Sequence, residues 1–168
     1  MKSSKLHSFA GICLLLMMAF AFAGCRDKCK RITCVNGTCA EGICNCSTGY
    51  FHEDCAAVIN AAFPGTWTNS EECTAGSDGY SISMLTAGNS KTDLQLVGIW
   101  ELNSDTVLAS VDANGLDISI GRQTVGGVEI AGEGLANADQ DELTLTYRVY
   151  NLGQSNPFDV CTAVLSKN

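Results

Sequence analysis

Histidine, proline and charged side chains are scarce in this chain of 168 residues. It contains two histidines, His7 and His52, and two prolines, and charged residues make up only 17%. Because no histidine follows His52, no Ser-His-Asp set can form in the C-terminal part. The chain also lacks a phosphate-binding loop, a dinucleotide fingerprint and an HExxH motif. We therefore expect no enzyme, no catalytic residues and no cofactor.

Bases are almost absent after Cys55, where four bases and 14 acids give a net charge of −10. Such a surface repels the phosphates of nucleic acids, so we exclude DNA and RNA as partners. The densest acidic groups are Glu71-Glu72 and the Asp139 to Glu142 stretch, and both fall near predicted turns. We interpret them as solvated loops rather than as a pair of glycosidase carboxylates.

Only one long hydrophobic run is present. Phe9 to Phe22 is an apolar segment of 14 residues that follows Lys2 and Lys5. It is shorter than the roughly 20 residues of a transmembrane helix and is typical of a signal peptide, which we place at residues 1–24. Ala21-Phe22-Ala23 fits an ordinary signal-peptidase site, which would release a secreted, soluble protein.

The same region offers a second cleavage site. Phe22-Ala23-Gly24-Cys25 resembles the lipobox of bacterial lipoproteins, in which the cysteine after the cleaved bond is lipidated. Of the ten cysteines, nine remain after ordinary cleavage and one stays unpaired, whereas lipid on Cys25 leaves eight that can all pair. We expect Cys25 to carry the lipid, with residues 25–28 as a lipid anchor and basic linker beside the membrane. Arg26 in the second position of the lipoprotein implies a bacterial outer-membrane location.

Cysteine is abundant between residues 29 and 55, where six cysteines fall in 27 residues. A segment this short cannot bury enough apolar surface to fold without covalent cross-links. Cys44-Asn45-Cys46 with His52 is a conceivable zinc site, but an exported chain meets oxidising conditions and no C-x2-C pair is present. We therefore expect three disulfides and no metal, although spacing alone leaves 15 pairings open.

This cysteine-rich segment resembles an EGF-like domain. Its run from Cys44-Asn45-Cys46 through Gly49-Tyr50 to Cys55 matches the C-terminal signature of that family. The resemblance implies a minor hairpin between Cys46 and Cys55. It also implies three disulfides: Cys29–Cys39, Cys34–Cys44 and Cys46–Cys55. Residues 56–62 form a connector so short that we expect the two flanking domains to touch.

Residues 63–168 carry apolar side chains at every second position, which predicts antiparallel strands with one buried face. Ile82 and Met84 form one such pair. Turn signals such as Asn114-Gly115 and Gly126-Gly127 separate the runs. We expect about eight strands, near residues 66–73, 80–87, 92–101, 106–112, 115–120, 123–133, 142–150 and 158–166.

Cys73 and Cys161 are the only cysteines of this second domain, so we expect them to pair. Cys73 ends the first predicted strand and Cys161 begins the last, which fits two antiparallel neighbours. A meander whose last strand meets its first is a closed up-and-down β-barrel without exposed edges. The expected fold class is mainly β, a small disulfide-rich EGF-like domain followed by a roughly eight-stranded antiparallel barrel, with a β-sandwich as the alternative.

Gly65-Thr66-Trp67 at the start of the first strand resembles the G-x-W motif of lipocalins, a family of calycin-type barrels. The resemblance implies that a base on a late strand, Arg148, covers Trp67. Gly98-Ile99-Trp100 has the same form, so both tryptophans are also candidates for the core or the barrel ends. We identify six possible ligand-contacting or core residues: Trp67, Tyr80, Met84, Trp100, Tyr147 and Arg148.

Two functions fit this organisation. The first is a non-enzymatic, lipid-anchored cell-envelope protein whose EGF-like spacer presents the barrel at the cell surface for interaction with, or adhesion to, a protein or glycan. Its contacts would come from the Asn151 to Pro157 and Asn137 to Asp141 loops. The second is a carrier of a small apolar ligand, which needs an open interior, whereas eight strands leave an interior only just wide enough for side chains. The oligomeric state is left open.

Overall fold

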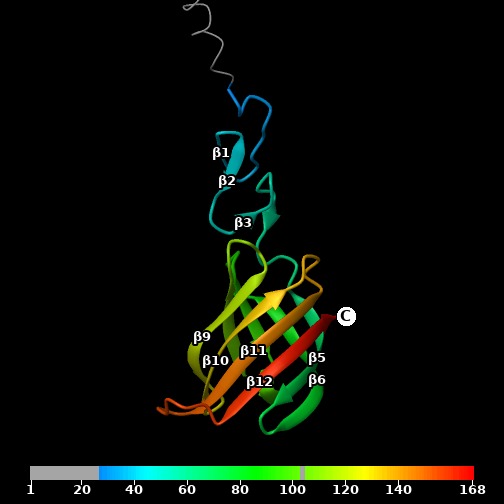
Figure 1. Cartoon of the computed structure of the whole chain (residues 1–168), viewed down its shortest axis with the longest axis vertical. Helices are drawn as coiled ribbons and strands as arrows, with labels where there is room; N and C mark the ends of the chain where they lie inside the picture. The colour runs from blue at the N-terminus through cyan, green and yellow to red at the C-terminus, as the bar shows by residue number, and fades with distance from the viewer. Residues whose placement is uncertain (1–26, 103–104) are drawn as a thin grey trace, which may run out of the picture.

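The computed structural model describes residues 27–102 and 105–168. A small disulfide-rich module, residues 27–58, stands on one end of a β-barrel, residues 63–168 (Figure 1). We call the barrel end next to the module proximal and the opposite end distal. The predicted signal peptide, residues 1–24, and the predicted lipid-bearing Cys25 lie outside the described residues. Within those residues, no helix combines the length and the apolar character that crossing a membrane requires.

The module consists of two small hairpins. Strand β1 (Gly37–Ala40) pairs with β2 (Ile43–Cys46), and strand β3 (Tyr50–Phe51) pairs with β4 (Ala57–Val58). The second hairpin therefore ends beyond Cys55, and the prediction that it lies between Cys46 and Cys55 is wrong. Cys55 has a left-handed φ of 57°, which reverses the chain and returns the next residues beside β3.

Three disulfides hold the module together, and they are the pairs that the family resemblance implies. They join Cys29 to Cys39, Cys34 to Cys44, and Cys46 to Cys55. Within residues 27–58 only Gly49 and Cys55 are buried. The module thus has almost no apolar core, and its stability depends on cross-links that restrict the unfolded chain.

The barrel has eight antiparallel strands, each paired with the next, and its last strand pairs with its first. This closed meander confirms the predicted up-and-down barrel and excludes the β-sandwich. The strands are β5 (Gly65–Cys73), β6 (Gly76–Thr86), β7 (Asp93–Val97), β8 (Thr106–Val111), β9 (Asp117–Val125), β10 (Val128–Ala136), β11 (Glu142–Asn151) and β12 (Asp159–Lys167).

Four predicted strands have wrong boundaries. The strand predicted at 80–87 begins earlier, at Gly76, and the one predicted at 115–120 continues to Val125. The strand predicted at 92–101 stops at Val97, because Gly98 has a φ of 90° and leads into a 3-10 turn, η1 (Ile99–Glu101). The strand predicted at 123–133 instead contains a hairpin turn at Gly126-Gly127, whose φ values are 57° and 84°. Positive φ at both central residues is typical of a type I′ two-residue hairpin turn, and glycine adopts it without strain.

Apolar side chains fill the barrel interior. Most inward positions of the strands are no more than 3% exposed, and an eight-stranded barrel is only just wide enough for its side chains. The fully buried set includes Trp67, Ile82, Met84, Leu94, Leu96, Ile130, Leu143, Leu145 and Tyr147.

The proximal end is closed by the chain that enters the barrel. Phe63 stacks on Trp67 with ring centroids 6.5 Å apart, and the Trp67 indole N–H donates to the Phe63 carbonyl at 2.9 Å. Asn60, 1% exposed, donates its Nδ2 to the carbonyls of Ser90 and Asp93. The predicted connector is therefore part of the barrel closure, and it brings the two domains into contact as expected.

The module also touches the proximal turns. Lys91 lies 4.2 Å from the centroid of the Tyr50 ring, and the Ile59 amide donates to the Gly49 carbonyl at 3.1 Å. Gly115, with a φ of +74°, sits so close to Phe51 that an added Cβ would lie 2.9 Å from its ring. These contacts pack the module against the proximal end of the barrel.

The barrel wall is weakest between β8 and β9. These strands pair only at Ser110 with Ser119 and at Val111 with Ile118, near the proximal end. The pairing of β8 with β9 does not continue toward the distal end. There β9 contains a bulge, which is seen as a shift of its register with β10 between Ile130 and Gly132. The Gln123 side chain bridges the resulting seam by accepting from the Leu108 amide at 2.9 Å and donating to the Leu108 carbonyl at 2.7 Å.

Candidate functional site

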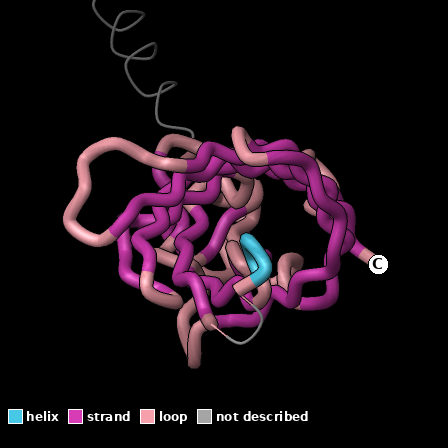
Figure 2. Tube along the Cα trace, turned by 90° about the horizontal axis from the view of Figure 1, so that it is seen from below, coloured by secondary structure: helices cyan, strands magenta, loops and turns pink. Residues whose placement is uncertain are grey.

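The distal end differs from the rest of the barrel because it is polar and irregular. It contains η1, the β5–β6 turn, the β9–β10 turn and the loop between β11 and β12. Figure 2 looks at the molecule from below, and η1 lies inside the outline of the strands there. Ile99 is buried in the core, so η1 is packed into this end rather than standing above it.

Glu71 is the centre of a buried polar group at this end. The side chain points inward from β5, and the residue is 4% exposed. Its Oε2 accepts from the Tyr147 hydroxyl at 2.5 Å and from the Asn69 amide at 3.1 Å. Asn69 is 2% exposed, and its Oδ1 is buried without a hydrogen-bond partner. The prediction that Glu71 belongs to a solvated loop is therefore wrong, whereas its neighbour Glu72 is exposed as expected.

Asp159 provides a second buried carboxylate. It begins β12, is 3% exposed, and accepts from the Trp100 indole N–H at 3.2 Å and from the Ala75 amide at 3.2 Å. The backbone of Trp100 is held as well, because its amide donates to the Tyr80 hydroxyl at 2.7 Å. Side chains from β6, η1 and β12 thereby converge on one spot.

Burial changes the acidity of the two tyrosines. Burial raises the pKa of Tyr80 to about 12, against an opposing hydrogen bond with Tyr147 and with support from the charge of Glu71. The pKa of Tyr147 is raised further, first by burial and then by its hydrogen bond to Glu71. Both phenols stay protonated at neutral pH, so neither acts as a base. The Tyr147 hydroxyl donates to the Glu71 carboxylate, and the Tyr80 hydroxyl accepts from the Trp100 amide.

The backbone of η1 is strained. Trp100 and Glu101 have φ values of 51° and 53°, a left-handed conformation that side chains other than glycine rarely adopt. Such residues cost free energy and persist where the surroundings hold them. Here the Tyr80 hydroxyl and the Asp159 carboxylate hold the backbone and the side chain of Trp100.

An open pocket of about 440 Å³ lies over these groups. Glu71, Asp159 and Trp100 form part of its wall, and the exposed carboxylates of Asp78 and Glu101 stand at its rim. The disulfide Cys73–Cys161 joins β5 to β12 beside it. Both sulfurs lie close to the Glu71 carboxylate, but disulfide sulfurs are not thiolates, so these three residues do not form a metal site.

Apolar side chains surround this end on the outside. Phe158 is 45% exposed and packs edge-on against Trp100, with ring centroids 5.8 Å apart. Leu152, in the β11–β12 loop, is 55% exposed. The loop is braced from β9 and β10, because Arg122 donates to Glu129 at 2.7 Å and to the Gln154 carbonyl, and the Gly153 amide also donates to Glu129.

The six residues predicted as ligand-contacting or core do not form one group. Trp67 is in the core at the proximal end, and Met84 is buried in the barrel interior. Tyr80, Tyr147 and Trp100 come together at the distal end. Arg148 is exposed on the outer face of β11, so it does not cover Trp67; the base that lies over Trp67 is Lys167, 5.9 Å from the ring centroid.

The sequence interpretation missed the burial of Asn69, Glu71 and Asp159, although a signal for all three was present. Counting by two from the buried Trp67 along β5 leads to Asn69 and then Glu71, so strand alternation alone places both on the inner face. Counting back by two from the buried Cys161 along β12 leads to Asp159 in the same way.

The two loops predicted to bind partners lie at opposite ends. The Asn151 to Pro157 loop is distal, whereas the Asn137 to Asp141 loop is at the proximal end, beside the module. In the proximal loop the Asn137 Oδ1 accepts from the amides of Asp141 and Glu142. This loop is closed on itself, so the distal loop is the better candidate for contact.

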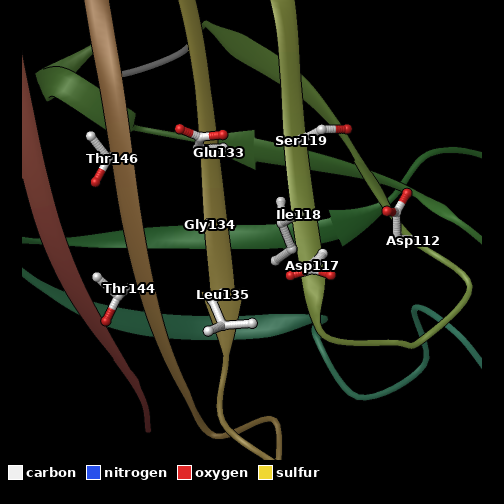
Figure 3. A pocket seen from close by; sticks show the side chains of 9 residues that line it. All are labelled: Asp112, Asp117, Ile118, Ser119, Glu133, Gly134, Leu135, Thr144 and Thr146. Atoms are coloured by element: carbon white, nitrogen blue, oxygen red, sulfur yellow. The ribbon is translucent and has the colours of Figure 1, made fainter.

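A second concavity lies on the outer wall. It is a groove of about 660 Å³ across β9, β10 and β11, and Gly134 is one of its lining residues. Figure 3 shows the side chains that line it. Hydroxyls and carboxylates stand along it on neighbouring strands, including Ser119, Glu133 and Thr146. Its carboxylates are exposed, and it contains no buried polar group of the kind present at the distal end.

No protein-family model matches the chain, and no curated protein matches it either. Its function therefore has to be inferred from its own geometry.

Proposed function

We propose that this protein is a non-enzymatic interaction module of the bacterial cell envelope, anchored by lipid on Cys25, in which an EGF-like spacer presents the distal barrel end to a protein partner. The observation that carries the proposal is the apolar surface at that end, where Leu152 and Phe158 are exposed and Phe158 packs edge-on against the partly buried Trp100. Exposed apolar clusters rimmed by polar groups are typical of contact surfaces.

The filled interior supports interaction rather than transport. A carrier in this fold would hold its ligand among the inward side chains, but Met84, Leu96 and Leu145 occupy that space and are no more than 1% exposed. We therefore do not favour the alternative of an apolar-ligand carrier.

The arrangement of the module supports a role as a spacer. In Figure 1 the start of the described chain (blue) lies at the end of the module away from the barrel, and Cys25 precedes it by two residues in sequence, so the module separates the proposed anchor from the barrel. Its three disulfides and its contacts with Lys91 and Gly115 stiffen the connection. A stiff spacer fixes the direction in which the barrel points.

The partner surface is testable by capture from intact cells. Residues 26–168 are immobilised in oxidised form, and the captured proteins are compared with those retained by a Leu152→Ser/Phe158→Ser variant. We expect that variant to lose the specific partner, because both side chains lie at the distal end. The matched control is Leu135→Ser/Val164→Ser, which removes two similarly exposed side chains from the outer wall. Equal capture by both variants would contradict the proposal, as would lipid that copurifies in native mass spectrometry.

The anchor is tested separately by cell fractionation. Cys25→Ser removes the proposed lipid attachment, so the protein should move from the membrane fraction to a soluble one. Cys13→Ser is the control, since that residue lies in the predicted signal peptide and leaves the fractionation unchanged. A Cys25→Ser protein that stays in the membrane fraction would contradict the proposed lipid anchor, but it would not bear on the proposed distal contact surface.

A further inference from the structure

The two buried carboxylates at the distal end have no basic partner. The ion pairs within residues 27–102 and 105–168 are Lys28–Glu41 and Arg122–Glu129, and neither involves Glu71 or Asp159. Buried charges are normally paired, because transfer from water into the protein is costly. An unpaired buried carboxylate that faces a pocket therefore indicates that the positive charge comes from outside the chain.

None of the four bases of the barrel pairs with Glu71 or Asp159 in the described residues. Lys91 lies over Tyr50 and Lys167 over Trp67, both at the proximal end. Arg122 pairs with Glu129, and Arg148 is exposed on the outer face of β11. None of these side chains completes the distal site.

Hydrogen-bonding capacity is also left over. Both described hydrogen bonds to the Glu71 carboxylate reach Oε2, from Tyr147 and Asn69. In the part of the chain that the structure describes, Oε1 accepts none, although the residue is 96% buried and lines the pocket. A donor placed in the pocket would complete this carboxylate, and a charged donor would form a stronger hydrogen bond than a neutral one.

We propose that the distal pocket binds an organic cation, the guanidinium or alkylammonium group of a basic peptide segment. The donor would approach Glu71 Oε1, and the Trp100 ring on the wall would supply an aromatic surface for the weakly hydrated part of the cation. Asp159 keeps the ring in place through the indole N–H and adds negative charge. The pocket volume of about 440 Å³ is in the range of small-ligand sites and accommodates such a side chain.

The chemistry of the wall favours an organic cation over a hard metal ion. Calcium takes six to eight oxygen ligands, whereas the buried oxygens available here come from two carboxylates that already accept hydrogen bonds. An indole face attracts guanidinium and quaternary ammonium groups, and it offers nothing to a strongly hydrated divalent ion. The net charge of −10 after Cys55 adds long-range attraction for basic partners.

This inference rests on the proposed function, since a protein partner would supply the cation, but its test needs no partner. The purified, oxidised protein is titrated at constant ionic strength with N-acetyl-arginine amide, with tetra-arginine and with tetramethylammonium, and tryptophan fluorescence is recorded. A Trp67→Phe variant assigns the signal to Trp100. We expect a saturable change with all three probes. Tighter binding of tetra-arginine identifies a peptide segment as the source, and equal binding identifies a small free cation.

Substitutions of single residues test whether the cationic probes bind in the distal pocket. Glu71→Gln keeps the shape and removes the charge, so we expect binding of N-acetyl-arginine amide to weaken at least tenfold. Asp141→Asn, an exposed carboxylate at the proximal end, should bind like the parent protein. Trp100→Leu, measured by calorimetry, should weaken tetramethylammonium more than it weakens N-acetyl-arginine amide.

Three results would overturn the cation site: no saturable change, equal binding by Glu71→Gln and the parent, or calcium chloride displacing the arginine probe at equal charge concentration. None of them bears on capture through Leu152 and Phe158. A failed cation site and a failed contact surface are therefore distinguishable.

Discussion

The two ends of the barrel are closed by different means. The proximal end is closed by packing, with Phe63 and Trp67 stacked in the core and Asn60 bonded to two carbonyls. The distal end is closed by one disulfide and by a polar group around Glu71 and Asp159. The contacts of the proximal end therefore favour stability. The distal end instead contains carboxylates without a basic partner and a strained backbone, which are features of binding sites.

The largest effect is expected from removing the distal cross-link. Cys73→Ala combined with Cys161→Ala opens a loop of 88 residues, which corresponds to about 4–5 kcal/mol of unfolding free energy in the chain-entropy model. Urea denaturation followed by tryptophan fluorescence measures the loss. The Cys46→Ala/Cys55→Ala variant is the control, because it changes the module and should leave the barrel transition almost unchanged. Equal losses in both would show that the two domains unfold as one unit.

Removing Trp67 should come next. Trp67→Ala empties a fully buried position at the proximal end and should cost about 3–5 kcal/mol. Trp100→Ala, at the half-exposed distal end, should cost about 1 kcal/mol, mainly for the hydrogen bond to Asp159. The remaining tryptophan reports unfolding in each variant. If Trp100→Ala costs as much as Trp67→Ala, the contrast between the ends is wrong.

A smaller effect is expected from the polar contact at the proximal end. Asn60→Ala removes the side-chain donor from the Ser90 and Asp93 carbonyls, of which Asp93 keeps the Ala87 amide, and should cost about 1–3 kcal/mol. Differential scanning calorimetry would show a lower Tm. Asn156→Ala, in the exposed distal loop, should stay within about 0.5 kcal/mol of the parent. An unchanged Tm in Asn60→Ala would mean that water replaces the Asn60 amide with no loss of unfolding free energy.

The seam between β8 and β9 extends the comparison into the wall. Gln123→Ala removes both side-chain bonds to the Leu108 backbone and should cost about 1 kcal/mol. Hydrogen exchange should show faster exchange at the Leu108 amide, with little change at the paired Val111 amide. Thr124→Ala, its exposed neighbour, is the control. Unchanged exchange at Leu108 would show that the seam stays closed without Gln123.

Alkaline pH should lower the free energy of unfolding through the two distal tyrosines, with no effect at neutral pH. The pKa of Tyr80 is about 12 in the folded protein against 10.0 for an ordinary tyrosine, and that of Tyr147 is raised as well. Between pH 10 and 12 the unfolded chain loses these protons while the folded chain keeps them, so stability falls as pH rises. Urea midpoints measured from pH 8.5 to 11.5 should fall less steeply for Tyr147→Phe. Parallel curves for the parent and the variant would contradict this assignment.

Strand alternation was enough to predict most of the barrel. Ile82, Met84, Leu143 and Leu145 are inward where period two places them, and the turn glycines separate the strands. The pattern failed where a local conformation interrupts it. Trp100 continues the alternation in sequence, but Gly98 turns the chain left-handed, so Trp100 leaves the strand and enters η1. The bulge in β9 likewise turns Gln123 toward β8, which alternation does not anticipate.

The sequence by itself determined the class of the molecule. The count of cysteines, their separation into two groups, the alternation of apolar residues and the excess of acids predict a cross-linked module and a closed acidic barrel, because each is a local or additive property of the chain. Only the tertiary structure decided which inward polar side chains meet and which base covers Trp67. Glu71, Tyr147 and Asp159 lie far apart in sequence and meet because barrel closure brings β5, β11 and β12 together. The candidate site is a product of that closure, so no stretch of sequence contains it.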